Sequence, residues 1–177
     1  MPAPTWRELT TGYLEHVRRL GFAPTTVEGH RKFLSALASW MSEHGRGDPR
    51  AVTRTDLLAF LAEVCPERWH PATRNERLGV VKRFFLWAAL EEKILASPAR
   101  EIEYAKVPDT LVTYLRRDEL AAILDSCGSS EASGLRDRAV LEVLYSTALR
   151  IGELCALNLD DVDRDAGALL AASANDT

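Results

Sequence analysis

Several features that mark particular classes of protein are missing from this chain of 177 residues. No apolar run approaches the roughly 18 residues that a membrane-spanning helix needs, and the opening "MPAPTWRELT" lacks the apolar core of a secretory signal peptide. We therefore expect no membrane association and a cytoplasmic location. The three cysteines, Cys65, Cys127 and Cys155, stand far apart, in neither metal-binding nor disulfide spacing, which predicts reduced thiols and no metal site.

Disorder does not fit the composition either, because hydrophobic residues make up 46% of the chain. A chain of this length fits one domain, or one small domain with part of another. Charge is divided unevenly: residues 1–106 carry 16 Lys and Arg against 13 Asp and Glu, whereas residues 107–177 carry 6 against 13. The division favours two units and hints that a polyanion would meet the first, although charge alone favours an ordinary solvated surface.

Helical periodicity dominates the first 95 residues. "TWRE" has the spacing of a capping box and opens a helix that Gly21 ends. Pro24 begins a second helix, and residues 53–64 and 70–95 form a third and a fourth. The predicted core comprises one face of the second helix and one of the fourth: Val27, His30, Leu34, Leu37 and Met41, and Leu78, Val81, Phe84, Phe85, Trp87 and Ala88.

A change in composition follows the fourth helix. Residues 96–110, "ASPAREIEYAKVPDT", contain two prolines and are predicted to be a linker between domains. Beyond it we expect helices over residues 115–127, 135–149 and 151–158, with Tyr145 in the core, and a strand, a turn at 165–167 and a return strand over 159–170. The fold class is therefore mainly α: an all-helical domain with its linker over residues 1–106, and a mixed α/β part over residues 107–177.

Basic residues gather on the second and fourth helices. Lys32 lies opposite the apolar face of its helix, between the small residues Gly29 and Ala36, which suits a close approach to a ligand. Arg74, Asn75 and Arg77 cluster in the first turns of the fourth helix, and Lys82 follows them. An ordinary solvated surface is the alternative for each of these residues.

Arg150 stands at a break between two apolar helices, in "LYSTALRIGELCALNLDDVD". A rigidly held guanidinium can donate two hydrogen bonds to a phosphate, because its planar fork matches the phosphate oxygens. Glu153, three residues later, is placed to hold it. The alternative is an exposed ion pair between the two side chains, worth about 0.3–0.5 kcal/mol.

The order of these segments resembles the tyrosine recombinases, the family of phage integrases and Xer-type proteins. "LRDRAVLEVLYSTALRIGELCALNLDDVD", residues 135–163, follows the family's pattern around its first arginine. "APTTVEGHRKFLSALASWM" and "TRNERLGVVKRFFLWAALEEKILASPA" resemble the second and last helices of its helical, SAM-like core-binding domain, and "VPDTLVTYLRRDELAAIL" resembles the entry to its catalytic domain. The resemblance spans about residues 5–168.

This resemblance implies a chemistry. The family breaks one DNA strand at a time without metal or other cofactor: a tyrosine attacks the phosphate, two arginines stabilise the developing charge, and a lysine from a β-hairpin and a histidine assist. By resemblance Arg150 is the first of the two arginines and Glu153 supports it, while Ala148 stands where the family usually has glycine. The implied contacts with double-stranded DNA are Thr26, Lys32, Arg74, Asn75, Arg77 and Lys82.

Other parts of that active site are missing from these residues. All four histidines precede residue 71, and none of Tyr13, Tyr104, Tyr114 and Tyr145 stands in the context of the family's nucleophile. "GALLAASANDT" occupies the place of the lysine hairpin. We therefore expect a truncated recombinase that binds DNA without cleaving it and is a monomer off DNA. Two alternatives remain: a stand-alone regulator that blocks a full-length recombinase, which would then be its partner, and a helical interaction module that binds no DNA.

Overall fold

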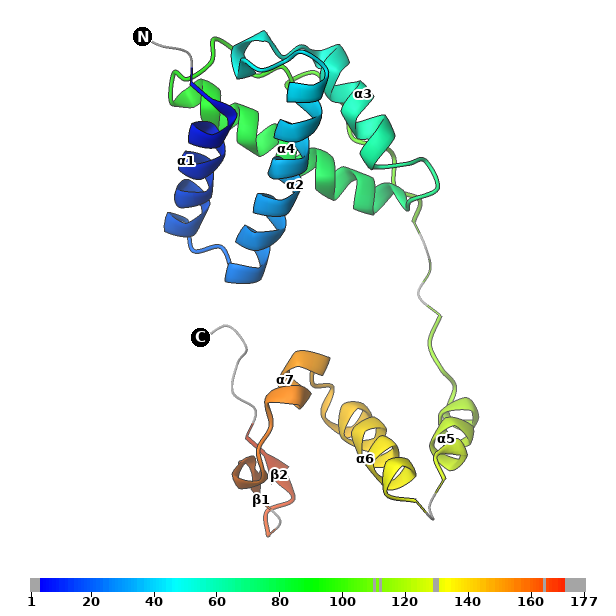
Figure 1. Cartoon of the computed structure of the whole chain (residues 1–177). Coiled ribbons are helices and arrows are strands. Elements are labelled where there is room, and N and C mark those ends of the chain that lie inside the picture. The colour runs from blue at the N-terminus through cyan, green and yellow to red at the C-terminus, as the bar shows by residue number, and fades with distance from the viewer. Residues whose placement is uncertain (1–3, 110, 112, 129–130, 164, 171–177) are drawn as a thin grey trace. The chain divides into compact units, whose positions relative to one another are not determined.

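The computed structural model describes residues 4–109, 111, 113–128, 131–163 and 165–170, and the chain divides into two compact units, Met1–Asp109 and Thr110–Thr177 (Figure 1). The expected fold class is confirmed, because helices dominate both units and strands are short. The end of the chain, where the sequence departs from a lysine hairpin, lies mostly outside the described residues.

The first unit contains four α-helices whose starts follow from local sequence. They are α1 (Trp6–Arg19), α2 (Pro24–Glu43), α3 (Arg54–Val64) and α4 (Pro71–Leu90), with a 3₁₀ turn at Pro49–Ala51. The predicted capping box opens α1: the Glu8 amide donates to Thr5 Oγ1 at 3.2 Å, and the Thr5 amide donates to Glu8 Oε2 at 2.7 Å. Gly21, with φ at 78°, follows the end of this helix as expected.

The core of this unit lies where α1 and α2 pack side by side and α4 crosses them (Figure 1). The predicted apolar stripes of α2 and α4 are buried, including Phe84, Phe85 and Trp87. The Phe84 ring meets Tyr13 edge-on at 5.4 Å between centroids and Phe85 at 5.0 Å. Gly12 allows Trp87 to approach α1, since a Cβ there would lie 2.9 Å from its ring. Burial of aromatic side chains therefore supplies much of the stability of this unit.

The fourth helix ends earlier than predicted, at Leu90 instead of residue 95. Glu92 takes a left-handed conformation, with φ at 55°, and the Lys93 amide donates to the Ala88 carbonyl at 2.9 Å. This reversed turn satisfies the last carbonyls of the helix and redirects the chain. The predicted linker also packs more tightly than expected, because Ala99 and Ile102 are buried.

The second unit consists of α5 (Arg117–Ser126), α6 (Ala132–Thr147), α7 (Ile151–Ala156), a 3₁₀ turn at Leu159–Asp161, β1 (Val162–Asp163) and β2 (Ala168–Leu169). The strands form the expected antiparallel hairpin, with Val162 opposite Leu169. Asp163 Oδ1 accepts hydrogen bonds from the amides of Asp165 and Ala166 at 3.0 and 2.9 Å, which shapes the turn.

Two expectations for this unit are wrong. Helix α6 begins at Ala132, three residues before the predicted start, and Tyr145 is 63% exposed instead of lying in the core. The exposure of Tyr145 reflects the whole unit: among its described residues no side chain is buried, so the apolar face of α6 stays partly exposed. Across the described parts of both units, no helix is both long and apolar enough to cross a membrane.

Candidate nucleic-acid interface and arginine site

Helix α2 presents two of the predicted DNA contacts to solvent. Thr26 is exposed, and the Lys32 side chain is 72% exposed, with its Nζ 3.8 Å from Glu28 Oε1. Beside Lys32 the surface is open, since a Cβ added at Gly29 would meet nothing within 4 Å. A phosphate could therefore approach this part of α2 closely.

Helix α4 carries two further predicted DNA contacts, both of them arginines. Arg74 and Arg77 are half-buried, and the described residues offer neither an ion-pair partner. The Arg77 guanidinium carbon lies 5.3 Å from the centre of the Phe33 ring on α2. A cation stacked on an aromatic face loses fewer rotamers when it binds an anion. Arg77 is thus held at the contact between α2 and α4.

Asn75 and Lys82 differ from the other predicted contacts, because both are bonded to the linker. The side-chain amide of Asn75 donates through Nδ2 to the Ala105 carbonyl at 2.7 Å. Its Oδ1 accepts from the backbone amide of Ala105 at 2.8 Å. Lys82 Nζ donates to the Ile102 carbonyl at 2.6 Å and lies 4.9 Å from the centre of the Tyr104 ring. Their polar groups are therefore already engaged by the protein itself.

His30 is buried on α2, near two arginines of α4. Burial lowers the pKa of its imidazole, and the charges of Arg83 and Arg77 lower that pKa further, against the smaller opposing effect of Glu76. The Tyr13 hydroxyl lies 3.4 Å from His30 Nδ1. The imidazole is therefore held neutral among cations that lie close to the predicted DNA-binding residues.

In the second unit, Arg150 is the N-cap of α7, and the Glu153 carboxylate, three residues later, accepts hydrogen bonds from it. The Arg150 amide donates to Glu153 Oε2 at 2.8 Å, and its Nη1 donates to Oε1 at 3.0 Å. The side chain of Glu153 is 14% exposed and that of Arg150 is 86% exposed. The backbone hydrogen bond, followed by the one from the guanidinium, lowers the pKa of the Glu153 carboxyl. Glu153 therefore holds the turn, and the remaining guanidinium donors face outward.

The turn that leads to Arg150 is made by a non-glycine residue in the left-handed region. Ala148 has φ at 55° and ψ at 24°, and its amide donates to the Leu144 carbonyl at 3.0 Å. A left-handed alanine costs about 1 kcal/mol relative to glycine. The chain therefore accepts strain two residues before Arg150, at the position where tyrosine recombinases are expected to have glycine.

Other reactive groups are scattered. Tyr13 is buried in the core of the first unit, whereas Tyr114 and Tyr145 in the second are exposed. No group of three or more potential metal ligands occurs among the described residues. Sequence reasoning missed Tyr104, which covers part of α4; the available signal was that Asn75, Gly79 and Lys82 lie on one face of this helix.

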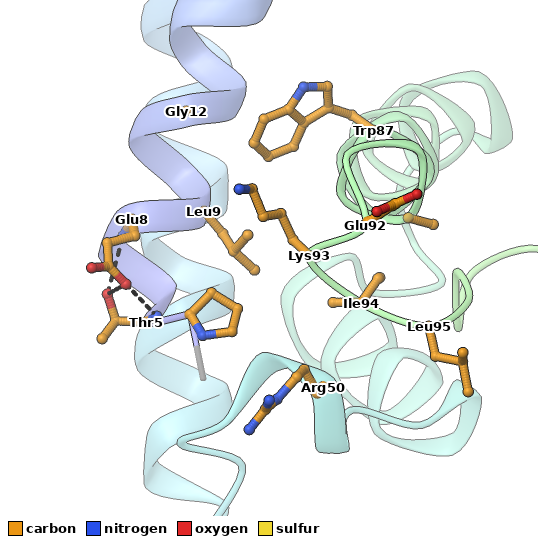
Figure 2. Close-up of a pocket in the computed structure, with 12 residues that line it drawn as sticks. Thr5, Glu8, Leu9, Gly12, Arg50, Trp87, Glu92, Lys93, Ile94 and Leu95 are labelled. Carbon is orange, nitrogen blue, oxygen red and sulfur yellow. Dashed lines mark hydrogen bonds between the residues drawn. The ribbon is translucent and has the colours of Figure 1, made fainter. Parts of the chain in front are cut away.

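A hollow of about 1000 Å³ opens between the start of α1 and the segment that follows α4. Figure 2 shows Lys93 extending across it toward α1, with Glu8, Arg50 and Trp87 on its walls. None of the eight candidate site residues lines this hollow. It is therefore distinct from the predicted DNA-binding residues of the first unit.

Known proteins match the chain in both units. Residues 11–92 match the phage integrase N-terminal SAM-like domain, and residues 113–173 match the phage integrase family. The tyrosine recombinase XerC of Myxococcus xanthus is 35% identical over 144 residues, which are 81% of this chain and 48% of that protein. XerC of Xanthomonas campestris is 32% identical over 142 residues, 80% of this chain and 44% of that protein. The chain thus spans about half the length of these curated relatives.

Solved structures share the fold. A lambda integrase dimer bound to a COC′ core site gives a TM-score of 0.70 at 18% identity, covering 96% of this chain and 49% of that one. The Tn1549 transposon integrase in complex with a circular intermediate DNA gives 0.66 at 18% identity, covering 90% and 49%. The two family models, which match different units of the chain, and the sequence identity to the XerC proteins show that the chain belongs to the phage integrase family of tyrosine recombinases.

Proposed function

We propose that these 177 residues bind double-stranded DNA through cations of α2 and α4 and take part in site-specific DNA recombination. The observation that carries the proposal is Arg77 stacked on Phe33, because it fixes a cation from α4 at the surface of α2. Lys32 and Thr26 are exposed on α2, and Arg74 is half-buried in the first turn of α4. The naming of the relatives as tyrosine recombinases, and the DNA complexes formed by lambda and Tn1549 integrases, support the choice of partner.

Binding of this kind rests mainly on phosphate contacts. Each phosphate neutralised by Lys or Arg releases a counterion, so the logarithm of the binding constant falls with that of salt concentration by about 0.9 per contact. Such contacts position the protein but read no sequence. We therefore expect modest sequence discrimination and strong salt dependence from these residues.

The test is fluorescence anisotropy with a labelled duplex between about 50 and 200 mM salt. Lys32→Glu and Arg77→Glu should weaken binding and flatten its salt dependence. Arg7→Glu is the matched control, since Arg7 is exposed on α1 and the charge change is identical. Equal weakening by all three variants would mean that net charge alone drives binding. No binding by the unchanged chain at low salt would favour a helical interaction module.

We further propose that these residues do not cleave DNA by themselves. Arg150 supplies one phosphate-binding cation, yet strand cleavage also needs a nucleophile and a general acid. Incubation with a nicked duplex that traps covalent intermediates should give no protein–DNA adduct. An adduct that Tyr145→Phe or Tyr114→Phe removed would overturn this part of the proposal.

A DNA-binding chain without cleavage could occupy recombination sites and block a full-length recombinase, which would make it a regulator. This form of the proposal predicts that adding the chain slows recombination by a full-length recombinase in proportion to site occupancy, and that Arg77→Glu abolishes the slowing. Its expected state off DNA is a monomer, which sedimentation measures directly.

A further inference from the structure

The linker is bonded to α4 at two places that lie on the same face of the helix. Asn75 pairs with both backbone groups of Ala105, donating to its carbonyl and accepting from its amide. Lys82 binds the Ile102 carbonyl through Nζ and the face of the Tyr104 ring through its charge. A side-chain amide that takes both groups of one residue acts as a strand partner for that residue.

The distances along the two segments match. Asn75 and Lys82 are seven positions apart, a distance of about 10 Å along the helix at a rise of roughly 1.5 Å per residue. Three extended residues, from Ile102 to Ala105, also span about 10 Å at roughly 3.3 Å each. The order is reversed, since the later linker residue meets the earlier helix residue. The linker therefore runs antiparallel along α4, and the chain leaves the unit close to the start of that helix (Figure 1).

Gly79 lies between the two bonded residues and leaves room for the linker. A Cβ at Gly79 would lie 3.7 Å from the Tyr104 hydroxyl oxygen, at ordinary contact distance, so a larger side chain would displace the tyrosine. Ile102 adds an apolar anchor, being 4% exposed beside Leu61 and Leu78. Hydrogen bonds, a cation–aromatic contact and an apolar anchor thus hold the same four linker residues.

We infer that the stripe Asn75–Gly79–Lys82 is a docking track for the linker, so that Asn75 and Lys82 are positioning residues and not DNA contacts. The track fixes the point at which the chain leaves the first unit at Ala105. Residues 106–116 are then the tether to α5, instead of the whole segment after α4. A shorter tether raises the effective concentration of the second unit near DNA that the first unit holds; this last step rests on the proposed DNA binding.

The track is tested without DNA by amide hydrogen exchange and by limited trypsin digestion of the full chain. Asn75→Ala and Lys82→Met should accelerate exchange at Ala105 and cleavage after Arg100 and Lys106 by about tenfold, the effect of losing one or two net hydrogen bonds. Lys32→Met is the control, since Lys32 does not touch the linker and its loss should leave both rates unchanged. Unchanged rates of exchange and cleavage in both Asn75→Ala and Lys82→Met would overturn the inference.

Core amides distinguish release of the linker from unfolding of the whole unit in Asn75→Ala. If only the linker is released, exchange at the amides of Leu34, Leu37 and Phe84 should stay slow. If these also accelerate, Lys82→Met, which keeps the apolar stem, decides the question alone.

Salt dependence of DNA binding separates positioning from phosphate contact. Lys82→Met should leave the slope of binding constant against salt unchanged, whereas Lys32→Met should lower it by about 0.9. A slope lowered by Lys82→Met would show a phosphate contact and overturn the inference. If the chain binds no DNA, the proposed function fails, while accelerated exchange at Ala105 in the Asn75 and Lys82 variants would still establish the docking track.

Discussion

The Glu153 carboxylate holds Arg150 at two points, its backbone amide at 2.8 Å and its guanidinium Nη1 at 3.0 Å. The backbone bond caps α7, and the guanidinium bond orients an otherwise exposed side chain. We predict that Glu153→Ala accelerates hydrogen exchange at the Arg150 amide, whereas Glu153→Gln, which retains an acceptor oxygen, accelerates it less. Equal acceleration by both variants would show that the charge, and not the capping bond, holds this turn.

Replacing Ala148 by glycine should increase stability, because the backbone conformation at this position favours glycine. Ala148→Gly relieves the cost of a positive φ and is expected to stabilise the α6–α7 turn by about 0.5–1 kcal/mol. Ala139→Gly, the same change at an exposed site inside α6, should instead destabilise by about 1 kcal/mol. Protection of α6 amides in hydrogen exchange measures both effects. Destabilisation by both variants would contradict the assigned conformation.

His30 makes the first unit sensitive to moderately acidic pH. Its pKa is lowered in the folded state, chiefly by burial, so the unfolded chain binds a proton more readily. The stability that comes from the neutral ring is present above the unfolded pKa of about 6.5 and is lost as pH falls below it.

Urea unfolding at pH 7.5 and pH 5.5 should therefore show a loss of stability that His30→Gln reduces. His44→Gln, at an exposed histidine on the end of α2, should keep the pH dependence of the unchanged chain. If instead His44→Gln removed the loss, the buried ring would not be its source.

Phe84 should be among the most sensitive positions of the core. It is fully buried and packs against Tyr13, Trp6 and Phe85. Phe84→Ala is expected to lower the free energy of unfolding by about 3–5 kcal/mol. Leu86→Ala, two residues away on the same helix but 54% exposed, should change it by less than about 0.5 kcal/mol. Similar losses in both would mean that α4 packs with a different face inward.

The helices of the first unit could be predicted because local and tertiary signals agree there. Thr5 and Thr53 supply capping boxes, and the apolar stripe of α2 is buried as its spacing indicates. The end of α4 could not be placed, because Glu92 adopts a left-handed turn that periodicity does not reveal. Tyr145 was misassigned because periodicity predicts which side chains share a face and not whether anything covers that face.

The candidate site likewise has features that local sequence predicts and features that depend on the folded chain. Residue type and helical position were enough to place Lys32 on an exposed surface, and Glu153 beside Arg150. They could not reveal that Asn75 and Lys82 bind the linker, since those bonds join residues 20 to 30 positions apart. Contacts of that range depend on the folded path of the chain.

Buried Ile102 has a consequence for changes in chain length. Its neighbours in sequence are Glu101 and Glu103, both exposed. Inserting or deleting one residue between Glu91 and Ile102 would shift one of these carboxylates into the apolar site, where an unpaired charge is costly. Between Lys106 and Arg116 the described side chains are all exposed, so the same change moves none of them out of a buried site. Length variation should therefore be rare in the first interval and tolerated in the second, so that the reach of the second unit can evolve without disturbing the first.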